Sequence, residues 1–242
     1  MGLIFHIKVY RLAFALSSLA LVQCTPLSVR AVNSSERVSQ QSEASSMEEL
    51  IQQLAVRGGD TAAIALGKLV DMGKTAVPAL VSALDSKDEQ VRALSAEGLS
   101  QIADPSTANR MFLALQDPNQ DVRAFAARTL DVIKDPRALD ALILTIDDAE
   151  DVLHYPYTVS LYALVRKTPA ILPKIVPVLR AKGQVTRVRA FLVLQTIVSA
   201  WKGQDWNKLW EQLGKYDPAA AETTRNAAAD RWAVWLGQQD LK

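Results

Sequence analysis

The sequence predicts an all-α protein, a right-handed α-solenoid of stacked antiparallel helix pairs with about five repeats and a C-terminal helical cap. Three observations favour this fold. Residues 88–96 (DEQVRALSA) are similar to residues 119–127 (NQDVRAFAA), which lie 31 residues later. We call this 31-residue offset the repeat step. Asp104-Pro105 recurs as Asp135-Pro136 after the same offset. The composition is rich in small and aliphatic residues and contains only 6% aromatic residues, which suits closely packed helices.

Residues 1–31 are typical of a secretory signal peptide. Lys8 and Arg11 provide a basic start, and residues 12–22 (LAFALSSLALV) form an apolar core too short to span a bilayer comfortably. An N-terminal membrane anchor and a buried helix are the alternatives. We therefore expect an exported protein, located in the periplasm, in a lumen or outside the cell.

A lipid anchor at Cys24 is a further alternative for the N-terminus. Residues 21–24 (LVQC) resemble a bacterial lipoprotein box, although Gln23 is bulky where a small residue is usual. Residues 32–46 follow and are rich in serine, glutamine and glutamate, so they bury too little apolar surface to offset their ordering entropy. We expect them to form a flexible linker.

Apolar residues at helical spacing predict a repeat array over residues 47–203. The first helices of the expected pairs are residues 47–54, 73–84, 107–115, 138–146 and 171–180. In the first pair, Asp60 or Thr61 is expected to cap the second helix. The second helices of the other four pairs are expected to span residues 91–102, 122–133, about 155–166 and 185–200. Because a proline disrupts a helix interior, Pro156 is expected to delay the start of the second helix in the fourth pair.

Residues 204–242 change in character and predict a tryptophan-rich cap. All five tryptophans lie between Trp201 and Trp235, and helices are expected at 204–213 and 219–236. A solenoid needs an atypical last unit to cover its final apolar face. The alternative is an aromatic groove that binds a partner.

The repeat residues also resemble a known family. Gly73-x-x-Ala76-Val77-Pro78-Ala79-Leu80, the starts at Val91-Arg92 and Val122-Arg123, and Asp135-Pro136-Arg137-Ala138-Leu139 are similar to HEAT repeats of the short bacterial type found in phycobilisome lyases. The resemblance implies an armadillo-like helical scaffold for protein binding. It also permits a phycobilin-lyase-like chaperone or enzyme that acts on a chromophore protein.

Four charged residues at the starts of second helices predict a structural ladder. Asp88 and Asp121 are expected to cap their helices. Arg92 and Arg123 are expected to pair with an acid of the neighbouring repeat. A ligand-binding role is the alternative for all four.

The inner row of second helices is the predicted binding surface. If Val122 and Leu130 face the core, Arg128 and Asp131 point away from it. One repeat later, Tyr155 and Tyr162 are expected at comparable outward positions. One repeat earlier, these positions belong to Glu97 and Ser100. Arg128, Tyr155 and Tyr162 are therefore the candidate binding residues for a protein or peptide. The alternative is that the two tyrosines pack under the turn at 147–151.

Composition opposes several other functions. Of the 27 basic residues, three lie in the predicted signal peptide, where no acid occurs, so the rest of the chain has a net charge of −2. This balance opposes nucleic-acid binding and, together with the export signal, a helical-repeat DNA glycosylase. His154 is the only histidine after His6, so we expect no metal, no cofactor and no catalytic triad. The predicted function is an exported, non-catalytic protein-interaction scaffold.

Overall fold

The computed structural model describes residues 46–150, 157–201 and 203–241. Of two units into which the chain divides, the second, Ala44–Lys242, is compact and contains all of the described residues. The predicted signal peptide and nearly all of the predicted linker lie outside the described residues, as do His154 and Tyr155. Within the described ranges, no helix combines the length and the apolar character that crossing a membrane requires.

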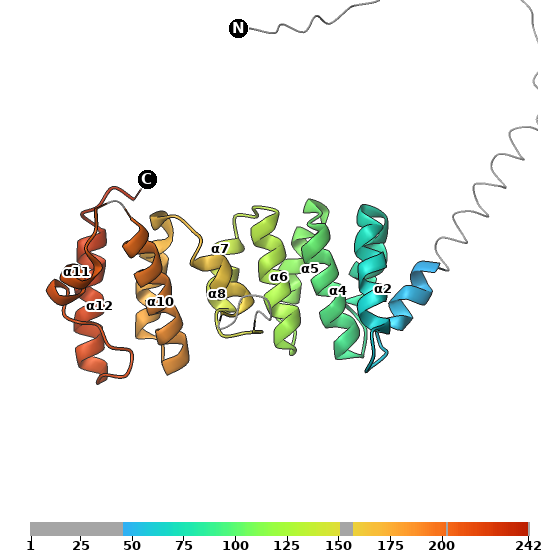
Figure 1. The fold of residues 1–242 in the computed structure, drawn as a ribbon, viewed down its shortest axis with the longest axis horizontal. Coiled ribbons are helices and arrows are strands. Elements are labelled where there is room, and N and C mark those ends of the chain that lie inside the picture. Colours follow the sequence, from blue (N-terminus) through green and yellow to red (C-terminus); the bar gives the residue numbers. More distant parts are fainter. Residues whose placement is uncertain (1–45, 151–156, 202, 242) are drawn as a thin grey trace, which may run out of the picture. The chain divides into compact units, whose positions relative to one another are not determined.

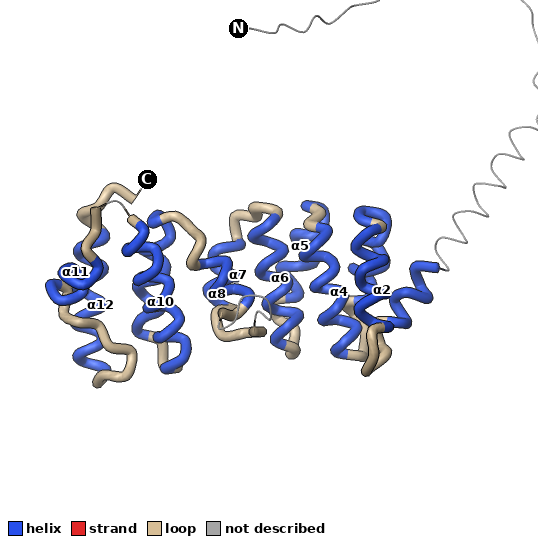
Figure 2. Tube along the Cα trace, viewed as in Figure 1, coloured by secondary structure: helices blue, strands red, loops and turns tan. Residues whose placement is uncertain are grey.

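The second unit is a row of helices joined by loops (Figures 1 and 2). The first helices of the pairs are residues 46–53, η1 Gly73–Ala76 with α3 Val77–Ala83, η2 Pro105–Thr107 with α5 Ala108–Ala114, α7 Ala138–Leu144, and η3 Pro169–Ile171 with α9 Leu172–Ile175 and η4 Val176–Arg180. The second helices are α2 Thr61–Asp71, α4 Glu89–Ile102, α6 Gln120–Val132, α8 Val159–Leu164 and α10 Gln184–Ala200. The row ends with α11 Trp206–Gln212 and α12 Glu222–Leu236. The predicted all-α solenoid of stacked helix pairs is confirmed.

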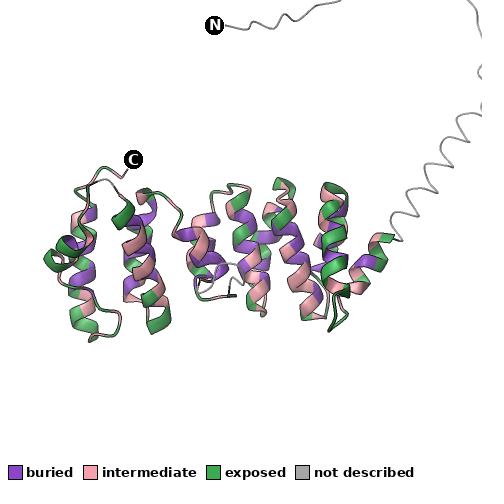
Figure 3. Cartoon of the chain, in the orientation of Figure 1, coloured by how far each residue is buried: buried purple, intermediate pink, exposed green. Residues whose placement is uncertain are grey.

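The sequence period is also the period of the core. Leu99, Leu130 and Leu161 follow one another at the repeat step, and none is more than 2% exposed. Figure 3 shows buried positions on helices along the length of the row. Each helix pair therefore buries the same face against its neighbours, as a stacked repeat requires.

Helix starts follow the repeat as well, with one correction to the predicted caps. The Asp88 carboxylate accepts a hydrogen bond from the Gln90 N–H (2.9 Å) at the start of α4. The equivalent cap of α6 is Asn119, which accepts from the N–H groups of Asp121 and Val122. The prediction that Asp121 caps this helix is therefore wrong, because Asp121 lies inside the first turn, one residue beyond the first helical position.

The fourth repeat departs from the others because α8 is short. It spans six residues, whereas α6 spans 13, and it begins at Val159 rather than near the predicted residue 155. Thr158 caps it by accepting from the Leu161 N–H (3.1 Å) and donates to the Ile146 carbonyl (2.8 Å). The hydroxyls of Thr145 and Ser160 lie 2.6 Å apart in the interior. These buried hydrogen bonds join α7 to α8.

The fifth repeat has a broken first helix. The predicted single helix over residues 171–180 is instead three short pieces, η3, α9 and η4. Pro173 and Pro177 each lack the N–H that a regular helix interior uses, which explains the interruptions. The apolar residues of this segment nevertheless stay buried, including Leu172, Ile175 and Leu179.

Arginines near the starts of second helices tie adjacent repeats together. Arg92 donates from Nε and Nη2 to the two carboxylate oxygens of Asp117 (2.9 and 3.1 Å), in the turn of the next repeat. Its Nη1 donates to the Ser86 carbonyl (3.0 Å) in its own turn. Arg123 repeats this arrangement with Asp148, at 2.9 and 2.6 Å, and with the Asp117 carbonyl. Bidentate pairs of this kind impose a defined geometry on the repeat interface.

Two further contacts extend this ladder. Arg187 in α10 is only 6% exposed and donates to the carbonyls of Ala181 and Lys182 and to that of Pro218, which lies in the terminal unit. Asp88 forms an ion pair with Arg57 of the preceding repeat, with 2.9 Å between Arg57 Nη2 and Asp88 Oδ1. The pKa of Asp88 lies below its usual range, first because of the hydrogen bond from the Gln90 N–H.

The terminal unit is built around Trp232, which is fully buried. Its indole stacks on Trp206 with ring centroids 5.4 Å apart and meets the ring of Trp235 edge-on at 5.6 Å. Tyr216 is also buried, and its hydroxyl donates to the Leu179 carbonyl (2.6 Å) in the fifth repeat. The arrangement covers the last repeat with aromatic side chains.

We predict that the ladder contributes to stability. Arg92→Ala is expected to lower the free energy of unfolding by about 1–3 kcal/mol, because it leaves the Asp117 carboxylate, 13% exposed, without its arginine partner. Arg110→Ala is the matched control, since its partner Asp85 is 80% exposed and such pairs contribute about 1 kcal/mol or less. Urea denaturation measures both. Equal effects of the two substitutions would contradict the structural role.

We also predict that the tryptophan cluster is required for a stable last repeat. Trp232→Ala is expected to cost about 3–5 kcal/mol, because it removes a fully buried aromatic side chain. Val234→Ala on the same helix is the control, since Val234 is 65% exposed, and it should change stability by about 0.5 kcal/mol or less.

Deleting residues 204–242 should cause aggregation, measured by light scattering. A soluble, equally stable truncated protein would show that this segment is an appendage.

Candidate functional site

A groove between α6 and α8 contains two of the three predicted binding residues. It has a volume of about 370 Å³. The residues lining it are Arg128, Asp131, Val132, Val159, Tyr162, Ala163, Arg166 and Lys167. We call this hollow the inner groove. Arg128 belongs to the third repeat and Tyr162 to the fourth, and the stacking of these repeats places both side chains in one site. Tyr155 lies outside the described residues.

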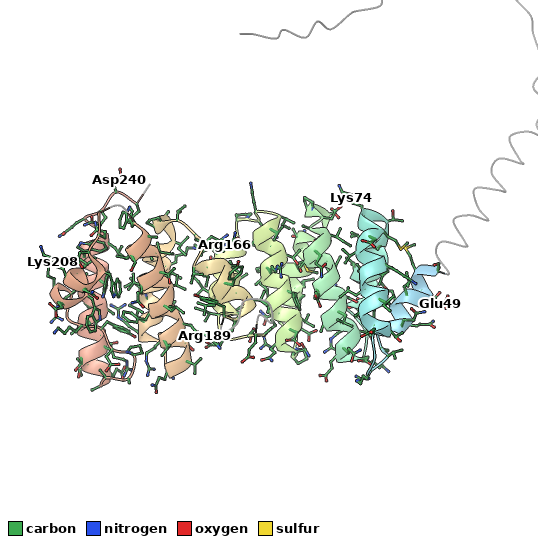
Figure 4. The ribbon with its side chains drawn as sticks, viewed as in Figure 1. Glu49, Lys74, Arg166, Arg189, Lys208 and Asp240 are labelled. Atoms are coloured by element: carbon green, nitrogen blue, oxygen red, sulfur yellow. The ribbon has the colours of Figure 1, made fainter. Side chains whose placement is uncertain are left out.

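Helical spacing explains which side chains meet in the inner groove. Arg128 and Val132 lie one turn apart on α6, and Val159 and Ala163 lie one turn apart on α8. Each member of the second pair follows its counterpart in the first by the repeat step, so the groove is formed by equivalent positions of neighbouring repeats. Arg166 lies beyond the end of α8, one turn after Tyr162. Figure 4 shows it in the middle of the row of helices.

Two of the charged residues in the inner groove neutralise each other. Lys167 forms an ion pair with Asp131, and both side chains are partly buried. This contact joins the end of α8 to α6. It leaves Arg128 and Arg166, both exposed, as the remaining cations of the lining.

An arginine lies over the tyrosine of the inner groove. The guanidinium carbon of Arg166 lies 5.1 Å from the centroid of the Tyr162 ring, and its Nη1 donates to the Tyr162 hydroxyl (3.2 Å). The Tyr157 ring packs against the Tyr162 ring at 6.1 Å with a tilt of 58°. A cation–π contact combined with a hydrogen bond restricts the arginine to few positions.

A second hollow lies one repeat earlier on the same face. It has a volume of about 480 Å³, and Glu97 and Gln101 of α4 are among its lining residues. These residues precede Arg128 and Val132 by one repeat step. The pKa of Glu97 lies above its usual range because burial disfavours the charged carboxylate, and the nearby Arg128 offsets part of this rise. Glu97 therefore links the second hollow electrostatically to the inner groove.

Two other predicted positions differ from expectation. Ser100 does not face outward with Glu97. It is 3% exposed, and its hydroxyl donates to the Glu97 carbonyl (2.8 Å), a hydrogen bond that lets it lie in the helix interface. Asp121 is partly buried and caps no helix. Its pKa is raised, first by burial and then by the neighbouring charge of Asp148.

Sequence reasoning missed several residues that complete the site and the ladder. The ladder acceptors are Asp117 and Asp148, which are separated by one repeat step, and each lies 25 residues after its arginine. That repeated offset was available in the sequence. Arg166 was also detectable, because it follows Tyr162 by one helical turn. The pairing of Lys167 with Asp131 depends on how two repeats stack, and no local pattern indicates it.

The side chains that line the inner groove are charged, aromatic or apolar. Its lining contains arginine, lysine, aspartate, tyrosine and small apolar residues, and it contains no serine, cysteine or histidine. In the described part of the chain, no cluster of three or more histidine, cysteine, aspartate or glutamate residues is placed to hold a metal ion. The groove can offer guanidinium donors, an aromatic ring and an apolar wall to a ligand.

Comparison with known families identifies part of the array. Residues 77–155 match the family model of HEAT repeats. This stretch covers the third repeat, most of the second and the first helix of the fourth, and it ends before α8 and Tyr162. It includes Arg92, Arg123 and Arg128. The HEAT character predicted from the motifs between Gly73 and Leu139 is therefore confirmed. No protein among curated ones matches the sequence.

Several solved structures are similar to this chain over most of its length. A chain in the structure of the complex of CpcE and CpcF of phycocyanin lyase from Nostoc sp. PCC7120 is 22% identical, and the match covers 78% of this chain and 99% of that one, with a TM-score of 0.38. An engineered protein is 19% identical, with coverages of 79% and 96% and a TM-score of 0.37. A designed armadillo repeat protein is 16% identical, with coverages of 77% and 98% and a TM-score of 0.34.

The raised pKa of Glu97 predicts a pH-dependent stability difference. A folded-state pKa above the unfolded value means that ionisation of Glu97 opposes folding. Glu97→Gln is therefore expected to stabilise the protein at neutral pH. The stability gain should disappear as the pH falls below about 4.5, where the carboxyl is protonated in both states. Thermal unfolding of the two proteins from neutral to acidic pH measures this. Glu49→Gln, an exposed position in helix 46–53 (Figure 4), is the control. A gain that persists at low pH would contradict the burial argument.

Proposed function

We propose that this protein is an exported, non-catalytic scaffold that binds a protein partner in the inner groove. The observation that carries the proposal is the meeting of Arg128 and Tyr162, from two different repeats, in one hollow on the face of the second helices. Arginine and tyrosine are enriched among the residues that dominate protein–protein binding energy. HEAT repeats, which residues 77–155 match, also favour protein interaction over chemistry.

The residue chemistry supports binding without catalysis. The lining of the inner groove contains no serine, cysteine or histidine, the residues that most often form a nucleophile–base pair. Four of its five ionisable side chains contact each other, Lys167 with Asp131 and Arg166 with the ring and hydroxyl of Tyr162, and the fifth is Arg128. These contacts fix the shape of the groove, which lowers the entropy that binding would cost.

Export is supported by the N-terminal sequence. Lys8 and Arg11 followed by the apolar residues 12–22 fit the basic and hydrophobic regions of a secretory signal peptide. The proposal predicts that intact-mass measurement of the protein from its own cells will find a shortened chain. Retention of Met1 in a cytosolic fraction would refute export and leave the binding proposal unaffected.

The binding proposal predicts that Arg128→Ala combined with Tyr162→Ala abolishes capture of the partner. The native protein is crosslinked in its own cells and isolated, and captured proteins are identified by mass spectrometry. The double variant should lose the specific partner while retaining its circular dichroism spectrum and most of its stability, because Arg128 is exposed and Tyr162 only half-buried. A captured partner that carries a bilin would instead favour the lyase-like alternative.

The matched control is Arg231→Ala, since Arg231 is an exposed arginine on α12 that does not line the inner groove. This variant should capture the partner as the native protein does. If the double variant retains the partner, the binding surface lies elsewhere. If it loses the partner only together with its fold, Tyr162→Phe separates the two roles, because the ring remains and only the hydroxyl is removed.

A further inference from the structure

The inner groove carries an excess of positive charge on a protein body that is slightly negative. Its lining contains three cations, Arg128, Arg166 and Lys167, and one carboxylate, Asp131. The chain beyond the predicted signal peptide has a net charge of −2. A local field opposite in sign to the rest of the surface selects ligands of complementary charge.

The two exposed arginines are available to a ligand to different degrees. Among the described residues, Arg128 forms no ion pair, and its influence on the pKa of Glu97 is electrostatic rather than a hydrogen bond. Arg166 donates one hydrogen bond to the Tyr162 hydroxyl, and its guanidinium lies against the Tyr162 ring. A guanidinium has five N–H donors, so several remain for an incoming oxygen. Because Arg166 is already held in place, less side-chain entropy is lost when it binds.

The rest of the lining provides an apolar surface beside these charges. Val132 is 49% exposed, and Val159 and Ala163 complete the wall. A scattered exposed valine is ordinary on a protein surface. Here it lies in the same hollow as two arginines, so a ligand that pairs with the cations can bury an apolar group at the same time.

We infer that the inner groove recognises an acidic segment of its protein partner, with carboxylates that pair with Arg128 and Arg166 and an aliphatic side chain that packs on Val132. This inference rests on the proposed function and specifies the chemistry of the partner. The pairing is the bidentate guanidinium–carboxylate contact that arginine forms readily.

The same residues disfavour a nucleic acid as the ligand. Binding to a phosphate backbone draws on clustered lysines and arginines, whereas this groove contains a carboxylate and neutralises its only lysine with it. Single-stranded nucleic acids also stack their bases on exposed aromatic rings. In the inner groove the ring of Tyr162 is occupied by Arg166 and flanked by Tyr157.

Fluorescence anisotropy of a labelled peptide that alternates glutamate with leucine tests the inference on the full processed chain. The peptide should bind, and versions with glutamine or lysine in place of glutamate should bind at least about tenfold more weakly. Arg128→Ala and Arg166→Ala should each weaken binding of the acidic peptide by about tenfold, whereas Arg231→Ala should not. Equal binding of the glutamine peptide, or of an oligothymidylate, would overturn the inference.

A gain in affinity provides a test that misfolding cannot imitate. Asp131→Asn removes the one carboxylate of the lining and releases Lys167 from its ion pair, so it should tighten binding of the acidic peptide severalfold. Unchanged or weaker binding by this variant, with its fold intact, would contradict the charge argument.

The two proposals can fail separately. If the Arg128 and Tyr162 double variant loses the native partner but the acidic peptide neither binds nor competes, the scaffold function stands and the acidic-segment inference is wrong. If the double variant retains the partner and the acidic peptide does not compete with it, both proposals are wrong.

Discussion

The register of the central repeats depends on a contact that reaches from the second helix of one repeat, α4 or α6, to the turn of the next. Arg92 and Arg123 make this contact to Asp117 and Asp148 with two hydrogen bonds each, while a third nitrogen holds the turn of their own repeat. Apolar packing alone would allow neighbouring helices to slide, because leucine and alanine surfaces are adaptable. A bidentate pair at a constant offset defines one register. The inner groove depends on that register, because its two walls belong to different repeats.

The fourth repeat shows how a solenoid can vary one unit without losing the stack. Its second helix is short, and buried hydroxyls of Thr145, Thr158 and Ser160 hold it to its partner helix. The ion pair between Lys167 and Asp131 connects its far end to the third repeat. Polar contacts therefore replace part of the helical packing used elsewhere, and the groove lined by Arg128 and Tyr162 lies beside this atypical unit.

Much of the fold could be predicted from the sequence because the repeat is local and regular. The repeat step correctly indicated the paired helices and the buried positions such as Leu99 and Leu130. It also indicated that Arg92 and Arg123 occupy equivalent positions. Aligning Asp121 with Asp88 was an error of register, because the residue one step after Asp88 is Asn119. Counting the step consistently would have identified the correct cap.

The candidate site was harder to predict for a physical reason. Helical spacing shows which residues of one helix share a face, so Arg128 and Val132 could be placed together. It does not show how far two helices are separated or which opposite charges meet across them. Asp131 and Lys167 lie 36 residues apart, which is not a multiple of the step, and their pairing follows only from the packed structure. The same limit applies to Ser100, whose burial depends on its neighbour helices.

The terminal unit has a consequence for how unfolding of this protein is observed. All five tryptophans lie between Trp201 and Trp235. The rings of Trp201, Trp206, Trp232 and Trp235 contact one another, and Trp206 also packs on Phe191 of the fifth repeat. Tryptophan emission therefore reports on one end of the stack, whereas far-ultraviolet circular dichroism sums over every repeat. In a linear array, stability can differ from end to end. The two optical signals will coincide only if the entire row unfolds as one cooperative unit.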